Sequence, residues 1–151
     1  MCELRGLADL IEEPLPPEDI DGLKALKEAS YACGGPKIAA GERTATLYDR
    51  HMMRMVTEQM VDIFQPDIGN CGGFTSFYEL AAVATMYNVA MAPHNPNGPL
   101  SVAQGIQAIA SVRNGHIFET VGNEAEEELA AQLLTNPEVV RSKDGFIKLP
   151  T

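Results

Sequence analysis

The chain has 151 residues, of which 45% are hydrophobic and 21% are charged. A chain of this length can bury roughly 68–70% of the surface that its unfolded form exposes, so size and composition together exclude a disordered protein. The formal net charge is -10 and no long run of Lys or Arg occurs, which argues against binding to nucleic acid. These values predict one globular protein.

Cysteine usage and the N-terminus bear on the cellular location. Cys2, Cys33 and Cys71 are an odd number with no metal-binding or redox spacing, which predicts reduced thiols in the cytoplasm rather than a disulfide framework. The N-terminal segment is acidic where a signal peptide would be basic and then apolar, so we expect no export by that route. The most apolar stretch, 80–92, is shorter than the ~20 residues of a membrane-spanning helix, so we expect no membrane segment.

Short β-type runs alternate with longer runs of helical periodicity, a pattern typical of βα units around a parallel sheet. The predicted strands are 7–11, 36–40, 61–65, 89–92 and 116–118. Apolar residues at helical spacing predict helices near 20–26, 52–60, 74–84 and 101–113, although Gly105 weakens the last of them. An acid-rich helix over 124–134 and a loose tail complete the chain.

One acidic or basic residue follows each predicted strand. These residues are Glu12, Glu42, Asp67, His94 and Glu119, and they lie 25 to 30 residues apart. The carboxyl ends of parallel strands open on the same face of a sheet, which is where ligands bind. A single acid after a strand is most often a solvated loop residue, but the same offset after five strands indicates that the five side chains converge.

Chain length separates two architectures. A closed (β/α)8 barrel takes about 250 residues, so five of its eight units would need about 156. The sequence therefore predicts an α/β fold that is an incomplete TIM (β/α)8-type barrel of about five βα units. The alternative is an open doubly wound sheet, but the Gly-rich turn that such folds usually carry after their first strand is replaced here by Glu-Glu-Pro at 12–14.

Motifs at these strand ends resemble the mandelate racemase branch of the enolase superfamily, the mandelate racemase and muconate lactonizing enzyme family. The motifs, in the order of the fourth to eighth barrel strands of that family, are IEEPLPPED at 11–19, IAAGERT at 38–44, FQPDIGNCGG at 64–73, APHNPNGPLS at 92–101 and HIFE at 116–119. The resemblance covers essentially the whole chain and implies that it is the C-terminal part of the barrel.

The resemblance implies a Mg²⁺ site in which Glu12 and Glu42 are ligands. In the resembling enzymes, removal of a proton next to a carboxylate gives an enediolate, whose negative charge must be neutralised where it develops. Mg²⁺ does this, and it prefers carboxylate oxygens as ligands. Since the strand-end carboxylates would also repel one another without a cation, the charge count supports the same expectation.

The resemblance also implies the catalytic roles. His94, with Asp67 as its partner, would take a proton from a substrate carbon or give one to a departing hydroxyl, because its ordinary pKa lies near working pH. Glu119 would hydrogen-bond the carboxyl of a small-molecule substrate, a sugar acid. Arg43 and Glu13 are candidate substrate-binding residues, and an ion pair at the surface is an equal alternative for Arg43.

The sequence departs from the family pattern in ways that indicate which branch it resembles and which parts of the whole enzyme it lacks. No Lys follows Asp67 at 68–73, which argues against the muconate-lactonizing and dipeptide-epimerase branches. We expect the capping domain, the first three strands and a third metal-ligating Asp to be absent, with 1–122 forming a partial barrel and 123–151 a C-terminal helix and tail leading towards the missing capping domain.

Four functional hypotheses remain. The first is an acid-sugar dehydratase, supported by GERT at 41–44 and PHNPNGP at 93–99. A racemase or epimerase shares its proton-abstraction step. The isolated chain would be catalytically inert and would self-associate, because an open sheet leaves unpaired edges. A non-enzymatic acidic interaction domain would show no strand-end cluster.

Overall fold

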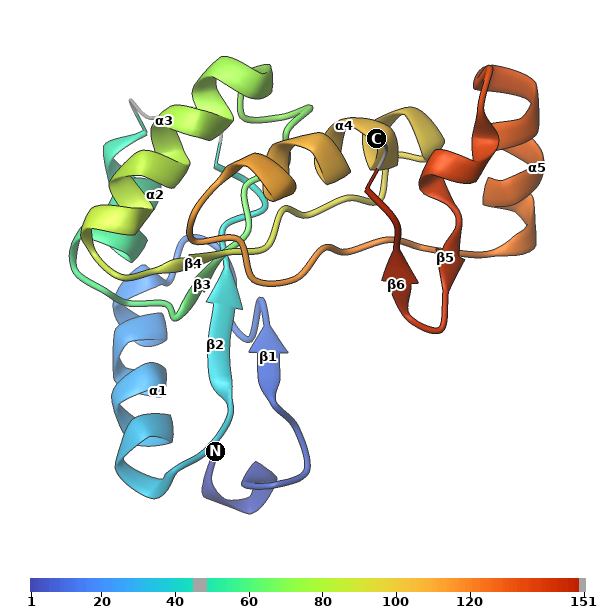
Figure 1. The fold of residues 1–151 in the computed structure, drawn as a ribbon. Helices are drawn as coiled ribbons and strands as arrows, with labels where there is room; N and C mark the ends of the chain where they lie inside the picture. The colour runs from blue at the N-terminus through green and yellow to red at the C-terminus, as the bar shows by residue number, and fades with distance from the viewer. Residues whose placement is uncertain (45–48, 150–151) are drawn as a thin grey trace.

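The computed structural model describes residues 1–44 and 49–149, and it places a parallel four-stranded sheet at the centre of the chain (Figure 1). The strands are β1 (Leu10–Glu12), β2 (Lys37–Ala40), β3 (Ile63–Phe64) and β4 (Ala90–Met91). The helices that follow them are α1 (Ile20–Cys33), α2 (Arg50–Thr57), α3 (Gly73–Met86) and α4 (Pro99–Ser111).

The strands are arranged in the sheet in their chain order, β1-β2-β3-β4, and every pair is parallel. In register, Leu10 lies opposite Lys37, and Ile63 lies opposite Ala90. A doubly wound sheet reverses its strand order at a switch point, whereas a barrel adds each strand beside the previous one. The observed order confirms the barrel-type α/β fold and excludes the doubly wound alternative.

The fifth predicted strand, 116–118, is wrong as an extended element. In the described residues this segment joins the sheet only through one parallel bridge, between Met91 and Gly115. Two hydrogen bonds make it: Met91 N–H donates to Asn114 O at 2.8 Å, and His116 N–H donates to Met91 O at 2.9 Å. In the described residues no strand pairs with the other side of this segment, so the sheet ends at this bridge. The first strand is also shorter than predicted, since Leu7 lies in the turn that follows a short 3-10 helix, η1 (Cys2–Leu4).

Side-chain caps explain where the helices begin. Asp19 accepts from Gly22 N–H at 3.0 Å before α1, and Asp49 accepts from Met52 N–H at 3.1 Å before α2. α4 begins at Pro99, a residue suited to the first helical turn. Gly105 within α4 has a packing reason, because a Cβ there would overlap the ring of Phe118.

The main core lies between the sheet and the helices α1, α2 and α3, which line one side of it in Figure 1. The predicted apolar helix faces are confirmed here. Fully buried members from the helices and strands include Leu23, Ile38, Met55, Val56, Phe64, Phe77 and Leu80. Each such side chain contributes roughly 1.5–3 kcal/mol when it leaves water.

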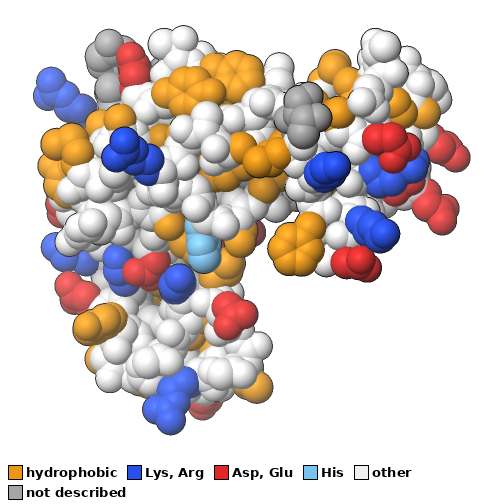
Figure 2. All heavy atoms as spheres, in the orientation of Figure 1, with side chains coloured by type: hydrophobic (Ala, Val, Ile, Leu, Met, Phe, Trp, Pro, Cys, Tyr) orange, Lys and Arg blue, Asp and Glu red, His pale blue; other side chains and the backbone are white. Residues whose placement is uncertain are grey.

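The acid-rich helix predicted over 124–134 is confirmed as α5 (Glu124–Leu133). The tail after it is more ordered than predicted and forms η2 (Pro137–Val140) and a hairpin of β5 (Ser142–Lys143) and β6 (Phe146–Ile147). Asp144 and Gly145 have φ of 52° and 81°, as a two-residue hairpin turn requires. These elements project beyond α4 in Figure 1, and Figure 2 shows a hollow between them and the body.

The expectation of three reduced cysteines is wrong. Cys2 and Cys33 form a disulfide with their Cα atoms 5.5 Å apart, and Cys71 is a free, buried thiol. The 31-residue separation matches no sequence motif, but η1 packs against the end of α1 and brings the two residues together. Within the described residues, no helix is both long enough and apolar enough to cross a bilayer.

Candidate active site at the strand ends

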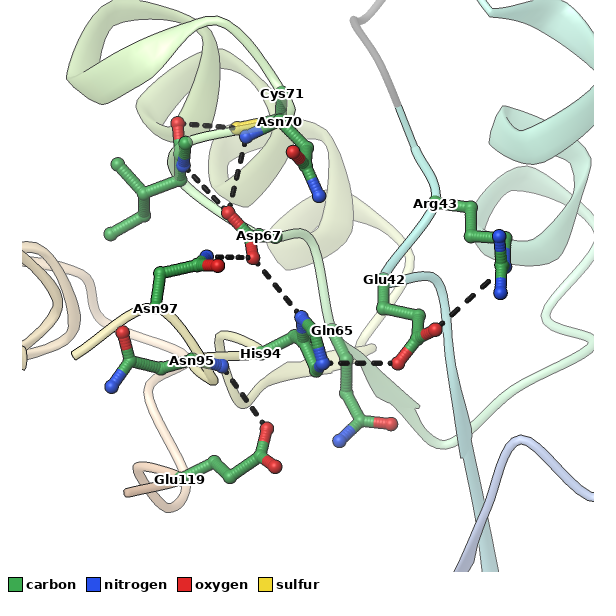
Figure 3. Close-up of polar contacts among 12 residues, drawn as sticks. Glu42, Arg43, Gln65, Asp67, Asn70, Cys71, His94, Asn95, Asn97 and Glu119 are labelled. Atoms are coloured by element: carbon green, nitrogen blue, oxygen red, sulfur yellow. Dashed lines mark hydrogen bonds and ion pairs between the residues drawn. The ribbon is translucent and has the colours of Figure 1, made fainter. Parts of the chain in front are cut away.

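Asp67 is the most enclosed residue of the candidate site. It follows β3 and is 0% exposed, and its carboxylate has four polar partners (Figure 3). Its Oδ1 accepts from Gly69 N–H at 2.7 Å and from Asn70 N–H at 3.1 Å. Its Oδ2 accepts from Asn97 Nδ2 at 2.8 Å and lies 3.1 Å from His94 Nδ1. Both carboxylate oxygens are therefore held in place.

His94 lies between two carboxylates from two different strand ends. Its Nδ1 lies 3.1 Å from Asp67 Oδ2, and its Nε2 lies 3.1 Å from Glu42 Oε2 (Figure 3). The doubly protonated ring is the form that can donate to both oxygens at once. The side chain is 17% exposed, so the ring is largely enclosed but reachable from the strand-end face.

Glu42 follows Gly41 at the end of β2, and its two oxygens have different neighbours. Oε2 faces His94, whereas Oε1 lies 3.7 Å from Arg43 Nε. The Arg43 side chain is 68% exposed, so water screens this ion pair, and it contributes little. The structure thus shows Arg43 in the surface pairing that the sequence left open, and its role toward substrate stays a prediction.

Glu12 and Glu13 are adjacent in sequence but have different surroundings. Glu12 Oε1 accepts from Gln65 Nε2 at 3.0 Å. The pKa of Glu12 is raised, first because its carboxylate is partly withdrawn from water and next because Glu119 lies nearby. Glu13 instead turns to the backbone of the next strand end, where its Oε1 accepts from Gly41 N–H at 2.7 Å. Its predicted contact with substrate remains untested.

Glu119 lies beyond the short segment that follows Gly115. Its Oε2 accepts from Asn95 N–H at 3.1 Å, which ties it to the loop that carries His94 (Figure 3). Direct contacts therefore join Glu42, Asp67 and His94, while Glu119 is joined through the backbone of Asn95. Glu12 is joined to them through Gln65, which lies two residues before Asp67, so the structure brings the five predicted residues together at the strand ends.

The carboxylates of the described residues are the type of ligand that a hard cation such as Mg²⁺ prefers, but they do not form a complete coordination shell. Glu12 and Glu42 supply carboxylate oxygens, and the pKa of Glu12 is raised first by its partial burial and then by the nearby Glu119 carboxylate. Within 1–44 and 49–149, no three His, Cys, Asp or Glu side chains are arranged so that they could hold one metal ion. A Mg²⁺ ion here would need further oxygens from water, substrate or residues outside this chain.

Three polar residues of the site are not among those predicted from the sequence. Gln65 donates to Glu12, Asn97 donates to Asp67, and Asn95 is buried beside Glu119. Gln65 carried a signal, because a polar residue at the end of a buried strand needs a partner. Asn97 lies in a loop rich in Pro and Gly, where an Asn is ordinarily a turn residue, so its contact could not be inferred from sequence.

Comparison with known proteins identifies the family. The model of the family described as enolase C-terminal domain-like matches residues 2–151. The chain belongs to this family. The fold agrees: a mandelate racemase/muconate lactonizing enzyme from Sulfitobacter sp. superposes with a TM-score of 0.77 at 28% identity, over 93% of this chain and 33% of that one.

Two further proteins that are similar to this chain give information about the chemistry of its relatives. D-galactonate dehydratase of Pectobacterium atrosepticum is 34% identical over 72% of this chain, which spans 27% of that protein. An enolase from Agrobacterium radiobacter, 37% identical with a TM-score of 0.63, was solved with sodium and L-malate bound. That match covers 74% of this chain and 27% of the other. The present chain thus spans about a quarter to a third of these relatives.

Proposed function

We propose that this chain is the C-terminal catalytic part of a Mg²⁺-dependent enzyme of the mandelate racemase type, an acid-sugar dehydratase. The observation that carries the proposal is the placement of His94 between Asp67 and Glu42, at 3.1 Å from each. The ring of His94, which would transfer the proton, thus contacts both Glu42, a candidate metal ligand, and Asp67, a buried carboxylate that would orient the ring. The similarity to a D-galactonate dehydratase supports a sugar-acid substrate.

The residues divide the work of the reaction. Glu12 and Glu42 would hold Mg²⁺, which when bound neutralises the negative charge that develops on the substrate carboxylate oxygens. Glu119 would orient the substrate carboxyl. Since L-malate occupies the related Agrobacterium enolase, a small hydroxy acid is the substrate class that the proposal favours.

His94 would move the proton. In dehydration, the C–H bond next to the carboxylate breaks, its electron pair forms the C=C bond, and the β-hydroxyl leaves with a proton as water; the resulting enol becomes the 2-keto-3-deoxy acid. His94 either takes the first proton or supplies the one that leaves with the hydroxyl. Asp67 would fix the ring, because it holds Nδ1 and so keeps Nε2, which lies 3.1 Å from Glu42 Oε2, as the nitrogen for proton transfer at the strand ends.

A racemase or epimerase is the second candidate, favoured by the fold match to the Sulfitobacter enzyme. The two reactions separate at the product. The chain, alone and within any longer polypeptide that carries it, is incubated with aldonic and aldaric acids and Mg²⁺. A 2-keto-3-deoxy product supports dehydration, whereas exchange of the α-hydrogen with deuterium from solvent and no keto product rejects it. His94→Asn should abolish either activity.

The metal role is tested separately by Mg²⁺ titration calorimetry. Glu42→Gln should weaken binding at least tenfold, and Glu28→Gln, an exposed change on α1, should not. Equal affinity of the two variants would reject Glu42 as a ligand and favour a non-enzymatic acidic domain.

We also propose that the isolated chain is inactive and self-associates. In the described residues β1 is paired on one side only, the outer side of β4 carries a single bridge to Gly115, and Phe146 and Ile117 are exposed at 79% and 48%. Turnover by purified monomeric chain would reject both statements.

A further inference from the structure

Asn97 shares a carboxylate oxygen with His94. Its Nδ2 donates to Asp67 Oδ2 at 2.8 Å, which is shorter than the 3.1 Å between that oxygen and His94 Nδ1. Two backbone N–H groups, of Gly69 and Asn70, occupy Oδ1. A carboxylate offers about four lone-pair sites, so these four partners saturate it.

Each partner contributes a different constraint on the carboxylate. The two donors on Oδ1 come from the loop that carries Asp67 itself, so they fix the carboxylate relative to β3. Among the residues that the structure describes, only Asn97 and His94 reach Oδ2, and both come from the loop after β4. Without Asn97, the position of Oδ2 relative to that loop would depend on the imidazole alone, which is the group that must exchange its proton.

The backbone around Asn97 suits this role. Pro96 and Pro99 restrict the chain on either side, and Gly98 has a φ of 81°, a left-handed conformation that favours glycine. The segment therefore loses little conformational freedom when the Asn97 carboxamide binds Asp67. The same short loop thus carries both the ring and the group that orients the ring's partner.

We propose that Asn97 is a positioning residue that sets the Asp67 carboxylate and, through it, the direction of His94. The inference rests on the proposed function in one respect, namely that the orientation of His94 matters to proton transfer. Saturation of Asp67 by a neutral donor keeps Oδ2 directed at Nδ1, so Nε2 remains the nitrogen that faces the strand-end carboxylates.

The test measures the ring N–H proton of His94 in the full 151-residue chain by NMR, assigned by its loss in His94→Gln. The wild-type chain should show a downfield, slowly exchanging resonance from the Nδ1–H that donates to Asp67. Asn97→Leu, similar in size but without a donor, should broaden it or speed its exchange at least tenfold. Asn70→Ala is the matched control, because only the backbone N–H of Asn70 contacts Asp67. If Asn97→Leu unfolds by circular dichroism, Asn97→Ala replaces it.

A folded Asn97 variant whose resonance exchanges as in Asn70→Ala would overturn the proposal, and so would the absence of the resonance from the wild-type chain. In an active polypeptide that contains this chain, Asn97→Leu should lower kcat about 10–100-fold with KM little changed, and Asn97→Gln, which keeps the donor, should restore part of it. If no sugar acid is dehydrated but the NMR result holds, the proposed function fails and the positioning role stands.

Discussion

Glu13 Oε1 accepts a hydrogen bond from the backbone N–H of Gly41 at 2.7 Å, which ties the end of β1 to the end of β2. The same oxygen lies 3.4 Å from Glu42 N. Glu13 has a φ of 40°, which is uncommon for a residue other than glycine, so its conformation serves this contact. The link fixes the backbone from which the Glu42 side chain projects.

Glu13→Ala should therefore destabilise the chain by about 1–3 kcal/mol, the cost of leaving a buried N–H donor without a partner. Glu13→Gln retains a carbonyl acceptor and should lose less. Urea denaturation of both variants checks the order. Glu18→Ala, at an exposed position, should change stability by less than about 0.5 kcal/mol; equal losses for all three would contradict the link.

Gly41→Ala should be among the most damaging single changes in the chain. Gly41 has a φ of 122°, and an added Cβ would overlap the ring of Phe64, which is 0% exposed and has no room to move. Gly6→Ala is the matched control, because Gly6 has a φ of 76° and nothing within 4 Å of an added Cβ. We expect a loss of about 1 kcal/mol at Gly6 from backbone strain alone and about 2–4 kcal/mol at Gly41. Similar losses in thermal unfolding would show that the packing argument is wrong.

The Cys2–Cys33 bond should stabilise the oxidised chain. It closes a loop across a 31-residue separation, and constraint of the unfolded chain predicts a gain of about 3–4 kcal/mol. Dithiothreitol should lower the unfolding midpoint of the wild-type chain and leave Cys33→Ser unchanged. A reductant effect of equal size on both proteins would exclude the pairing.

Cys71 should be chemically silent in the folded chain. Burial, and then the nearby Asp67 carboxylate, raise the pKa of the Cys71 thiol from its ordinary value of 9.0 to about 11. At pH 8 its thiolate fraction is on the order of 0.1%, so iodoacetamide should label it only after unfolding. Rapid labelling of the native chain at pH 8 would contradict this.

The same shift predicts a pH dependence with a defined sign. The folded state holds the proton more tightly than the unfolded state, so the contribution of Cys71 to stability is complete below about pH 9 and is lost as pH rises towards 11. Cys71→Ala should flatten the stability profile in that window. A wild-type profile that rises between pH 9 and 11 would reverse the assignment.

The sequence predicted the side chains of the site better than the elements that carry them. Strand-end position alone located Glu42, Asp67 and His94, because parallel strands bring their carboxyl ends to one face. The strand predicted over 116–118 failed, since strand formation depends on pairing with distant segments and not on local composition alone. Local sequence patterns do not predict the contact of Asn97 or the Cys2–Cys33 bond, because each joins segments that are distant in sequence or irregular in structure.

Glu42, Asp67 and His94 follow three different strands, β2, β3 and β4, while the main core packs between the sheet and α1, α2 and α3. Chemistry and scaffold are therefore separable under mutation. The loop 93–98 after β4 contributes no residue to the main core, so exchanging it for that of a relative changes His94 and its neighbours without repacking that core, and new substrate preferences can be explored there.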